Sequence, residues 1–196
     1  MDKLSKELHE IRVEKAQILN TRINQELKDL EMGKAEFITQ INEVEKFNSR
    51  GKDDIEFYIR TNIGEEAKPL NKIASGGEMS RIMLSIKTVL AESDKVPVMI
   101  FDEIDTGISG KAAKMVGQKL KYIGNSHQVI CITHQASIAA KGDQNYFINK
   151  EVLNERTHTN IKRLLQEEII DEIARIANGD ITDISRKHAL ELIHSV

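Results

Sequence analysis

The spacing of hydrophobic residues changes once along the chain, near Gly33. Before it, apolar side chains recur at mixed steps of three and four with no glycine or proline between them, which predicts one long amphipathic helix over residues 1–32. The apolar positions are Leu4, Leu8, Ile11, Ile18, Leu19, Ile23, Leu27 and Leu30. The stripe is narrow, so we expect its first half to pair with another helix in a coiled coil. A helix lying on its own domain is the alternative, and Gly33 is expected to end the helix.

After residue 33 the pattern becomes one of strands followed by strands alternating with helices. Alternation of apolar and polar residues predicts two antiparallel strands near 35–41 and 54–60. Later segments predict strands at 96–101, 128–133, 146–149 and 157–163, with helices at 78–91, 111–123, 136–140, 167–177 and 181–193. This order favours an α/β fold with right-handed crossovers over residues 33–196. The run 96–101 is apolar throughout, as expected for a strand buried on both faces of a parallel sheet.

Composition narrows the class of protein only a little. The chain has 196 residues, of which 40% are hydrophobic, and its net charge of −3 gives no support for a protein that coats DNA. Its single cysteine, Cys131, excludes an intramolecular disulfide and fits a reducing compartment. No apolar stretch approaches the length of a membrane span, so we expect no membrane partner.

The first candidate site is the run Ser75-Gly76-Gly77-Glu78, which opens a predicted helix. Free backbone N–H groups and the positive end of the helix dipole make such a start suitable for a phosphate. The two glycines let the backbone approach that phosphate closely, and the Ser75 hydroxyl adds a donor. The plainer interpretation is a glycine-rich turn with Ser75 as the helix cap.

The second candidate site follows the apolar strand that ends at Phe101. Asp102 and Glu103 suit a magnesium ion held through water and a carboxylate that polarises an attacking water, respectively. Two adjacent carboxylates after six apolar residues are costly unless a cation lies there, although a simple ion pair is the alternative. His134 follows the next predicted strand, so it is expected at the same sheet edge and in reach of the same ligand.

One expected part of a nucleotide site is missing from this sequence. No segment has the spacing Gly-x-x-x-x-Gly-Lys-Ser/Thr, in which a loop of backbone N–H groups and a lysine hold the phosphates. The chain therefore carries half of an ATP site at most.

With these residues placed, the chain resembles the RecN-type proteins, which are SMC-like, ABC-type ATPases of bacterial DNA double-strand-break repair. The resemblance covers nearly the whole chain and is most specific in Ile73–Arg81 and Phe101–Gly110. Ser109 stands where related ATPases carry the aspartate of the D-loop, and a Gly-Ile-Ser-Gly run there is typical of the RecN type. The residues after His134 depart from the Leu-Pro-Gln that the family usually shows, which puts the shape of that loop in doubt.

The resemblance implies a C-terminal lobe of an ATPase head, with residues 1–32 as the end of a coiled-coil arm. It assigns Glu103 and His134 to catalysis, the Ser75–Glu78 run to nucleotide binding across a dimer of heads, and Asp102 to Mg²⁺. Asp105 and Ser109 would form the D-loop.

It further implies ATP as cofactor, and as partners DNA, an N-terminal ATPase lobe and a second copy of the protein. The expected location is the cytoplasm, at the nucleoid. Without the phosphate-binding loop, this chain alone is expected to be inactive. The alternatives are the head of another SMC-like or ABC-type protein, such as a transporter subunit, and a coiled-coil adaptor without catalysis.

Overall fold

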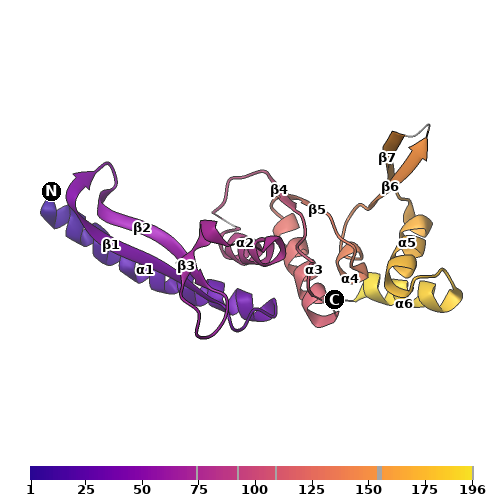
Figure 1. The fold of residues 1–196 in the computed structure, drawn as a ribbon, viewed down its shortest axis with the longest axis horizontal. Coiled ribbons are helices and arrows are strands. Elements are labelled where there is room, and N and C mark those ends of the chain that lie inside the picture. The colour runs from indigo at the N-terminus through magenta and orange to yellow at the C-terminus, as the bar shows by residue number, and fades with distance from the viewer. Residues whose placement is uncertain (74, 92, 109, 154–155, 196) are drawn as a thin grey trace.

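The computed structural model describes residues 1–73, 75–91, 93–108, 110–153 and 156–195. The elements follow one another in chain order along an extended molecule, from the long helix α1 at one end to helices α5 and α6 at the other (Figure 1). Mixed helices and strands with a long N-terminal helix confirm the predicted α/β class. None of the helices in the described ranges is long and apolar enough to cross a membrane.

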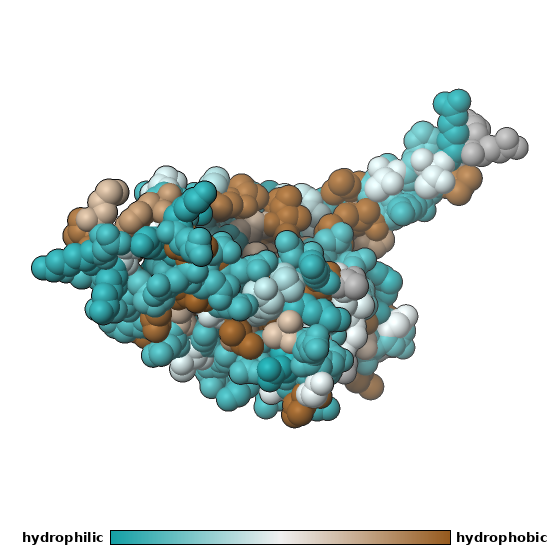
Figure 2. Space-filling view, turned by 60° about the vertical axis from the view of Figure 1, so that its left-hand side comes forward, coloured by the Kyte–Doolittle hydropathy of each residue, from teal (hydrophilic) through white to brown (hydrophobic). Residues whose placement is uncertain are grey.

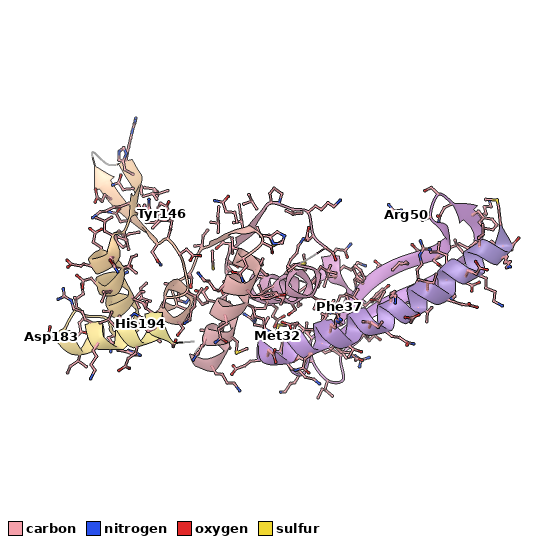
Figure 3. All side chains as sticks on the ribbon, turned by 180° about the vertical axis from the view of Figure 1, so that it is seen from behind. Met32, Phe37, Arg50, Tyr146, Asp183 and His194 are labelled. Carbon is pink, nitrogen blue, oxygen red and sulfur yellow. The ribbon has the colours of Figure 1, made fainter. Side chains whose placement is uncertain are left out.

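The N-terminal part is a helix lying on a β-hairpin. Helix α1 spans Asp2–Asp29, and strands β1 (Glu36–Asn48) and β2 (Gly51–Arg60) pair antiparallel, with Phe37 opposite Ile59. The short strand β3 (Lys68–Pro69) adds to β2, and a 3-10 turn, η1, covers Leu70–Lys72. In Figure 3 the hairpin runs beside the helix, with Arg50 at its turn near the start of α1 and Phe37 near Met32. The two predicted strands are confirmed, and both are longer than expected.

Apolar side chains hold this unit together at one end and polar ones at the other. The apolar cluster consists of Ile23, Leu27, Phe37, Ile59, Ile82 and Ile86. Further toward the N-terminus the helix carries polar residues on the same face, and the buried carboxylate of Asp53 accepts hydrogen bonds at 2.7 Å from His9 Nδ1 and Arg12 Nη1. Burial alone would raise the pKa of Asp53, but the hydrogen bonds from Arg12 and His9 outweigh it and lower that pKa.

The end of α1 differs from the sequence prediction. The helix stops at Asp29, and Glu31 takes the left-handed backbone conformation with φ of 58°, so Gly33 is not the residue that ends it. The N–H of Met32 then bonds to the carbonyl of Leu27 at 2.9 Å, which satisfies one of the last free carbonyls of the helix.

The middle of the chain forms a small parallel sheet with helices on one side. Helix α2 (Gly76–Leu90) leads to strand β4 (Val98–Phe101), helix α3 (Gly110–Gly124) crosses over to strand β5 (Gln128–Cys131), and the short helix α4 covers Ala136–Ala139. Strands β4 and β5 pair parallel, as predicted. The apolar cluster beneath them contains Leu30, Leu84, Met99, Phe101, Ile104, Ala113, Val116, Leu120, Ile123 and Ile138. Leu30, the residue that follows α1, thus lies in the same core as β4.

The expectation that the strand after residue 96 is buried on both faces is wrong for this chain. Met99 and Phe101 point into the core, whereas Ile100 on the opposite face is 66% exposed and Val98 is also exposed. The same holds for β5, where Ile130 is 44% exposed. Nothing in the described part of the chain packs over this face, so the apolar residues that predicted a two-sided burial are left open on one side.

The third strand of the expected sheet does not join the parallel pair. Strand β6 (Tyr146–Leu153) pairs antiparallel with β7 (Arg156–Arg163), and this hairpin projects from the rest of the molecule (Figures 1 and 2). Helices α5 (Gln166–Asn178) and α6 (Asp183–His194) close the chain as a helical hairpin around Gly179, whose positive φ of 83° ends α5.

Candidate functional site

The N-terminus of α2 is built as the sequence predicted, with Ser75 as its cap. The Ser75 hydroxyl accepts a hydrogen bond from the N–H of Glu78 at 3.4 Å, and the helix begins at Gly76. Both Ser75 and Gly76 are exposed, whereas Gly77 is buried. A Cβ on Gly77 would come within 3.0 Å of the Glu103 carbonyl oxygen and of Thr106 Cβ, so a glycine is required for the close approach of α2 to the turn after β4.

Asp102 and Glu103 form a tight turn at the carboxyl end of β4. The Asp102 carboxylate accepts a hydrogen bond at 2.9 Å from the N–H of Glu103, and Glu103 adopts the left-handed backbone conformation with φ of 55°. Such a conformation is uncommon for a residue other than glycine and costs free energy, and residues held in this way are concentrated at functional sites. Both side chains are exposed to solvent at the sheet edge.

The Glu103 carboxylate lies directly against the start of α2 in the same chain. A Cβ placed on Gly76 would be 2.3 Å from Glu103 Oε2. The predicted phosphate-binding helix start and the predicted catalytic carboxylate are therefore neighbours, and a negative charge already occupies the positive end of the helix dipole. Any side chain at Gly76 would have to displace that carboxylate.

Asp105 links the two strand ends. Its buried carboxylate oxygen Oδ2 accepts hydrogen bonds from Thr133 Oγ1 at 2.6 Å and from the backbone N–H of His134 at 2.8 Å. The same oxygen lies 3.1 Å from His134 Nδ1, while the side chain of His134 as a whole is 72% exposed. The structure therefore brings His134 to the same edge as Asp102 and Glu103, as its position after β5 suggested, with its ring open to solvent. Ser109, the other predicted D-loop residue, lies outside the described residues.

Two residues that the sequence reasoning missed hold this turn in place. Ser80 Oγ donates to the Asp102 carbonyl at 2.8 Å, and Arg81 Nη1 donates to the carbonyls of Ile104 at 3.3 Å and Thr106 at 2.8 Å. Burial lowers the pKa of the Arg81 guanidinium, which is only 7% exposed. The signal that could have revealed Arg81 is its spacing, since it stands three residues before Leu84 on α2 and so shares a face with that apolar residue.

Cys131 lies at the end of β5, close to the candidate site. Burial, together with the nearby charges of Asp105 and Asp102, raises the pKa of its thiol to about 12. Because the thiolate is the reactive form, this raised pKa disfavours Cys131 as a nucleophile.

The donor set matches a magnesium site only in part. No group of three or more His, Cys, Asp or Glu side chains suitable for a metal occurs in the part of the chain that the structure describes. Mg²⁺ commonly keeps several waters and binds through one or two carboxylates and the phosphates of a substrate. The exposed Asp102 carboxylate fits such a partial site and not a complete protein cage.

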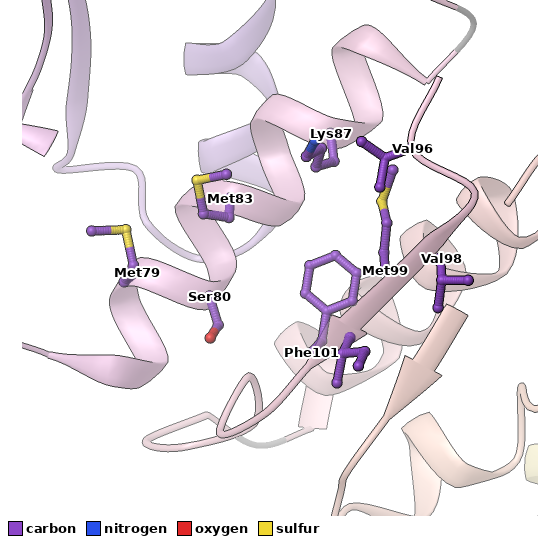
Figure 4. A pocket seen from close by; sticks show the side chains of 9 residues that line it. Met79, Ser80, Met83, Lys87, Val96, Val98, Met99 and Phe101 are labelled. Carbon is purple, nitrogen blue, oxygen red and sulfur yellow. The ribbon is translucent and has the colours of Figure 1, made fainter. Parts of the chain in front are cut away.

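Beside this edge lies an apolar groove between α2 and β4. It has a volume of about 310 Å³ and is lined by residues of α2 and by residues from both faces of β4 (Figure 4). These residues are Met79, Ser80, Met83, Lys87, Val96, Val98, Met99, Ile100 and Phe101. In the space-filling view, hydrophobic patches lie among a mainly hydrophilic surface (Figure 2).

Comparison with known proteins gives a consistent relationship. No protein-family model matches the chain. It is 45% identical over 195 residues to the DNA repair protein RecN of Rickettsia prowazekii, which covers 99% of the chain and 35% of the relative. The identity is 41% over 191 residues with RecN of Halalkalibacterium halodurans (95% and 34% covered) and 38% over 200 residues with RecN of Bacillus subtilis (94% and 35%). The chain thus spans about a third of the length of the curated relatives that it matches.

Solved structures agree on the fold. The Smc head domain with coiled coil and joint from Pyrococcus yayanosii matches with a TM-score of 0.56 and 18% identity, over 86% of this chain and 30% of that one. The Smc head domain of Pyrococcus furiosus with an extended coiled coil, bound to the C-terminal domain of ScpA, matches with a TM-score of 0.50 and 18% identity, over 78% and 36% of the two chains. The chain is therefore homologous to the C-terminal third of RecN DNA repair proteins and has an SMC head-like fold.

Proposed function

We propose that the chain is the C-terminal lobe of a RecN-type ATPase head, which hydrolyses ATP once a second lobe supplies the phosphate-binding loop. The observation that supports this most strongly is the meeting of three features at one sheet edge. The capped start of α2, the Asp102–Glu103 turn and the Asp105–His134 pair all lie at the carboxyl ends of β4 and β5. In α/β proteins this edge is where ligands bind.

Each residue has a separate role in this proposal. Asp102 would hold Mg²⁺ through water, Glu103 would polarise the attacking water, and His134 would contact the γ-phosphate side of the site. The Ser75–Glu78 helix start would face the nucleotide bound to a second head, so two heads would enclose two ATP molecules. DNA is proposed as the partner of the complete protein, because the matched relatives are DNA repair proteins.

The second lobe is proposed to cover the open face of β4 and β5. Val98, Ile100 and Ile130 expose apolar surface there, and the groove beside α2 continues it. Burying this surface would stabilise the complete head, since apolar area removed from water contributes roughly 25 cal/mol per Å². The exposed stripe of α1, which includes Leu4, Ile11 and Ile18, is likewise proposed to pair with a second helix of the arm.

The decisive test of the hydrolytic role is Glu103→Gln in the complete two-lobed protein. The amide keeps the shape of the side chain and loses the base, so ATP binding should persist while hydrolysis falls by about 10²-fold or more. Glu66→Gln, at an exposed loop carboxylate, is the matched control and should hydrolyse ATP normally. Equal hydrolysis by the Glu103→Gln variant and the unchanged protein would refute the assignment.

The separate role of the second lobe is tested by titrating the 196-residue chain with Mg-ATP in a calorimeter. Without a phosphate-binding loop, the chain has too few partners for a multiply charged ligand and should show little heat of binding and no turnover. Adding the N-terminal lobe of the RecN-type protein should restore magnesium-dependent hydrolysis. Tight binding by the chain alone would mean that its site is complete without a second lobe.

A side chain at Gly76 would affect two contacts, one with a second head and one within the same chain. Gly76→Asp places a carboxylate at the helix start that the proposal assigns to a second head's nucleotide, and head association on addition of ATP should fail. The new side chain also meets Glu103 Oε2 in the same chain. Association should therefore be measured in both Gly76→Asp and Glu103→Gln, since only a defect confined to Gly76→Asp reports on contact across the dimer.

A further inference from the structure

Arg81 is an unusual buried cation. It lies in the second turn of α2, is 7% exposed, and none of the carboxylates in the described part of the chain forms an ion pair with it. Its Nε is also buried without a hydrogen-bond partner. Its hydrogen bonds go to the backbone carbonyls of Ile104 and Thr106, the two residues on either side of Asp105.

Fold stability alone does not account for an arginine at this position. A buried guanidinium loses its hydration, and the charge of Glu78 on the same helix offsets that loss only in part, so burial still lowers the pKa of Arg81. A methionine of similar length would fill the same space without this cost. What an arginine adds is a rigid planar donor group that can hold two carbonyl oxygens at fixed positions.

The contacts of Arg81 continue without interruption to His134. Arg81 fixes the carbonyls on both sides of Asp105, and the Asp105 carboxylate in turn binds Thr133 Oγ1 and the backbone N–H of His134. On the helix side, Gly77 and Ser80 hold the same turn against the start of α2. The start of α2 and the loop after β5 are thus joined through one short turn.

We propose that Arg81 is a positioning residue that couples the start of α2 to the loop carrying His134. Displacement of α2 shifts the 104–106 turn, and Asp105 carries that shift to the N–H and ring of His134. The catalytic consequence of this coupling rests on the proposed function. In that function, a phosphate bound at the start of α2 would set the position of His134.

The test is amide hydrogen exchange of the 196-residue chain, followed by NMR without nucleotide. In Arg81→Met the His134 amide should exchange about tenfold faster, because a loss in opening free energy equal to one hydrogen bond of ordinary strength corresponds to that factor. The reference is the amide of Phe37, which also bonds to a side-chain oxygen, that of Asn24, but lies in the N-terminal unit. Its exchange should stay unchanged.

Lys87→Met is the matched control. Lys87 lies on the same helix, pairs with Asp94, and does not contact the 102–106 turn. Replacing Lys87 with methionine should leave the exchange rate of the His134 amide unchanged. A rise at His134 confined to Arg81→Met supports the coupling, whereas an unchanged rate, or an equal rise at Phe37, overturns it in favour of a purely structural role.

A second variant keeps the test decisive if Arg81→Met fails to fold. Arg81→Lys retains the charge but not the planar donor group, so the His134 amide should still exchange faster than in the unchanged chain. If the His134 amide exchanges at the same rate in Arg81→Lys as in the unchanged chain, the proposal is overturned. Because no nucleotide is present, either result is independent of whether Glu103→Gln abolishes hydrolysis.

Discussion

The β1–β2 hairpin and the β4–β5 pair are both apolar, yet the chain covers one of them and leaves the other half open. Phe37 and Ile59 of the hairpin lie under α1 and are almost completely buried. Strands β4 and β5 pack on α3 through one face, while Ile100 and Ile130 remain exposed on the other. The difference shows that the chain itself covers the hairpin face that carries Phe37 and Ile59, whereas the face of the parallel pair that carries Ile100 and Ile130 is left for another segment.

The polar contacts of the two regions differ as well. Asp53, Asn20 and Asn24 tie α1 to the hairpin, and Asn24 both donates to the Phe37 carbonyl and accepts from its N–H. At the parallel pair, the polar contacts instead gather at the carboxyl ends of the strands, around Asp105. Polar groups therefore fix the fold in the first region and form the candidate site in the second.

The largest expected change in the free energy of unfolding is at the contact between α1 and the β1–β2 hairpin. Ile23→Ala removes a fully buried side chain between α1 and the hairpin and should lower the free energy of unfolding by about 2 to 5 kcal/mol through lost burial and a cavity. Urea unfolding followed by circular dichroism measures this. The exposed Ile18 of the same helix is the control, and Ile18→Ala should change stability little. Equal losses in the two variants would mean that α1 does not rest on the hairpin through the Ile23 face.

A smaller loss of stability, dependent on pH, is expected where Asp53 of the hairpin binds α1. Asp53→Asn should cost about 1 to 3 kcal/mol at pH 7, because it removes the charge that Arg12 and His9 bind. The folded-state pKa of Asp53 is lowered, so its contribution is present above the unfolded pKa of about 3.9 and is lost as the pH falls through the folded value.

Unfolding measured from pH 7 down to pH 2 should therefore show the stability of the original chain and of Asp53→Asn converge in acid. Asp54→Asn, at the exposed neighbouring carboxylate, provides the control and should leave the pH profile unchanged. A constant difference across the whole range would contradict an ionic role for Asp53.

The smallest effect is expected on the open face. Ile100→Thr should change the free energy of unfolding of this chain by no more than about 0.5 kcal/mol, because its side chain is already largely in water. Met99→Ala, one position away on the covered face, should cost about 2 to 5 kcal/mol. The two urea midpoints, measured side by side, sharpen the contrast within a single strand. A large loss in Ile100→Thr would show that the open face is covered after all.

Much of the fold was predictable because short-range patterns carry it. Apolar spacing placed α1, α2, α3 and the parallel pair within a few residues of their observed bounds, and it found both strands of the β1–β2 hairpin but ended β1 seven residues too early. The motif positions at strand and helix ends likewise predicted that Asp102, Glu103 and His134 would meet at one edge, because parallel strands end on the same side.

The sequence by itself therefore determined which segments are helices and strands and which side chains stand at their ends, since both follow from local periodicity. Only the tertiary structure decided that Glu103 lies against Gly76, that Arg81 is buried over the turn around Asp105, and that one face of β4 stays open. These features depend on contacts between residues more than twenty positions apart, or on whether any partner covers a face. Local spacing records the apolar character of a side chain, but it does not specify what that side chain will touch.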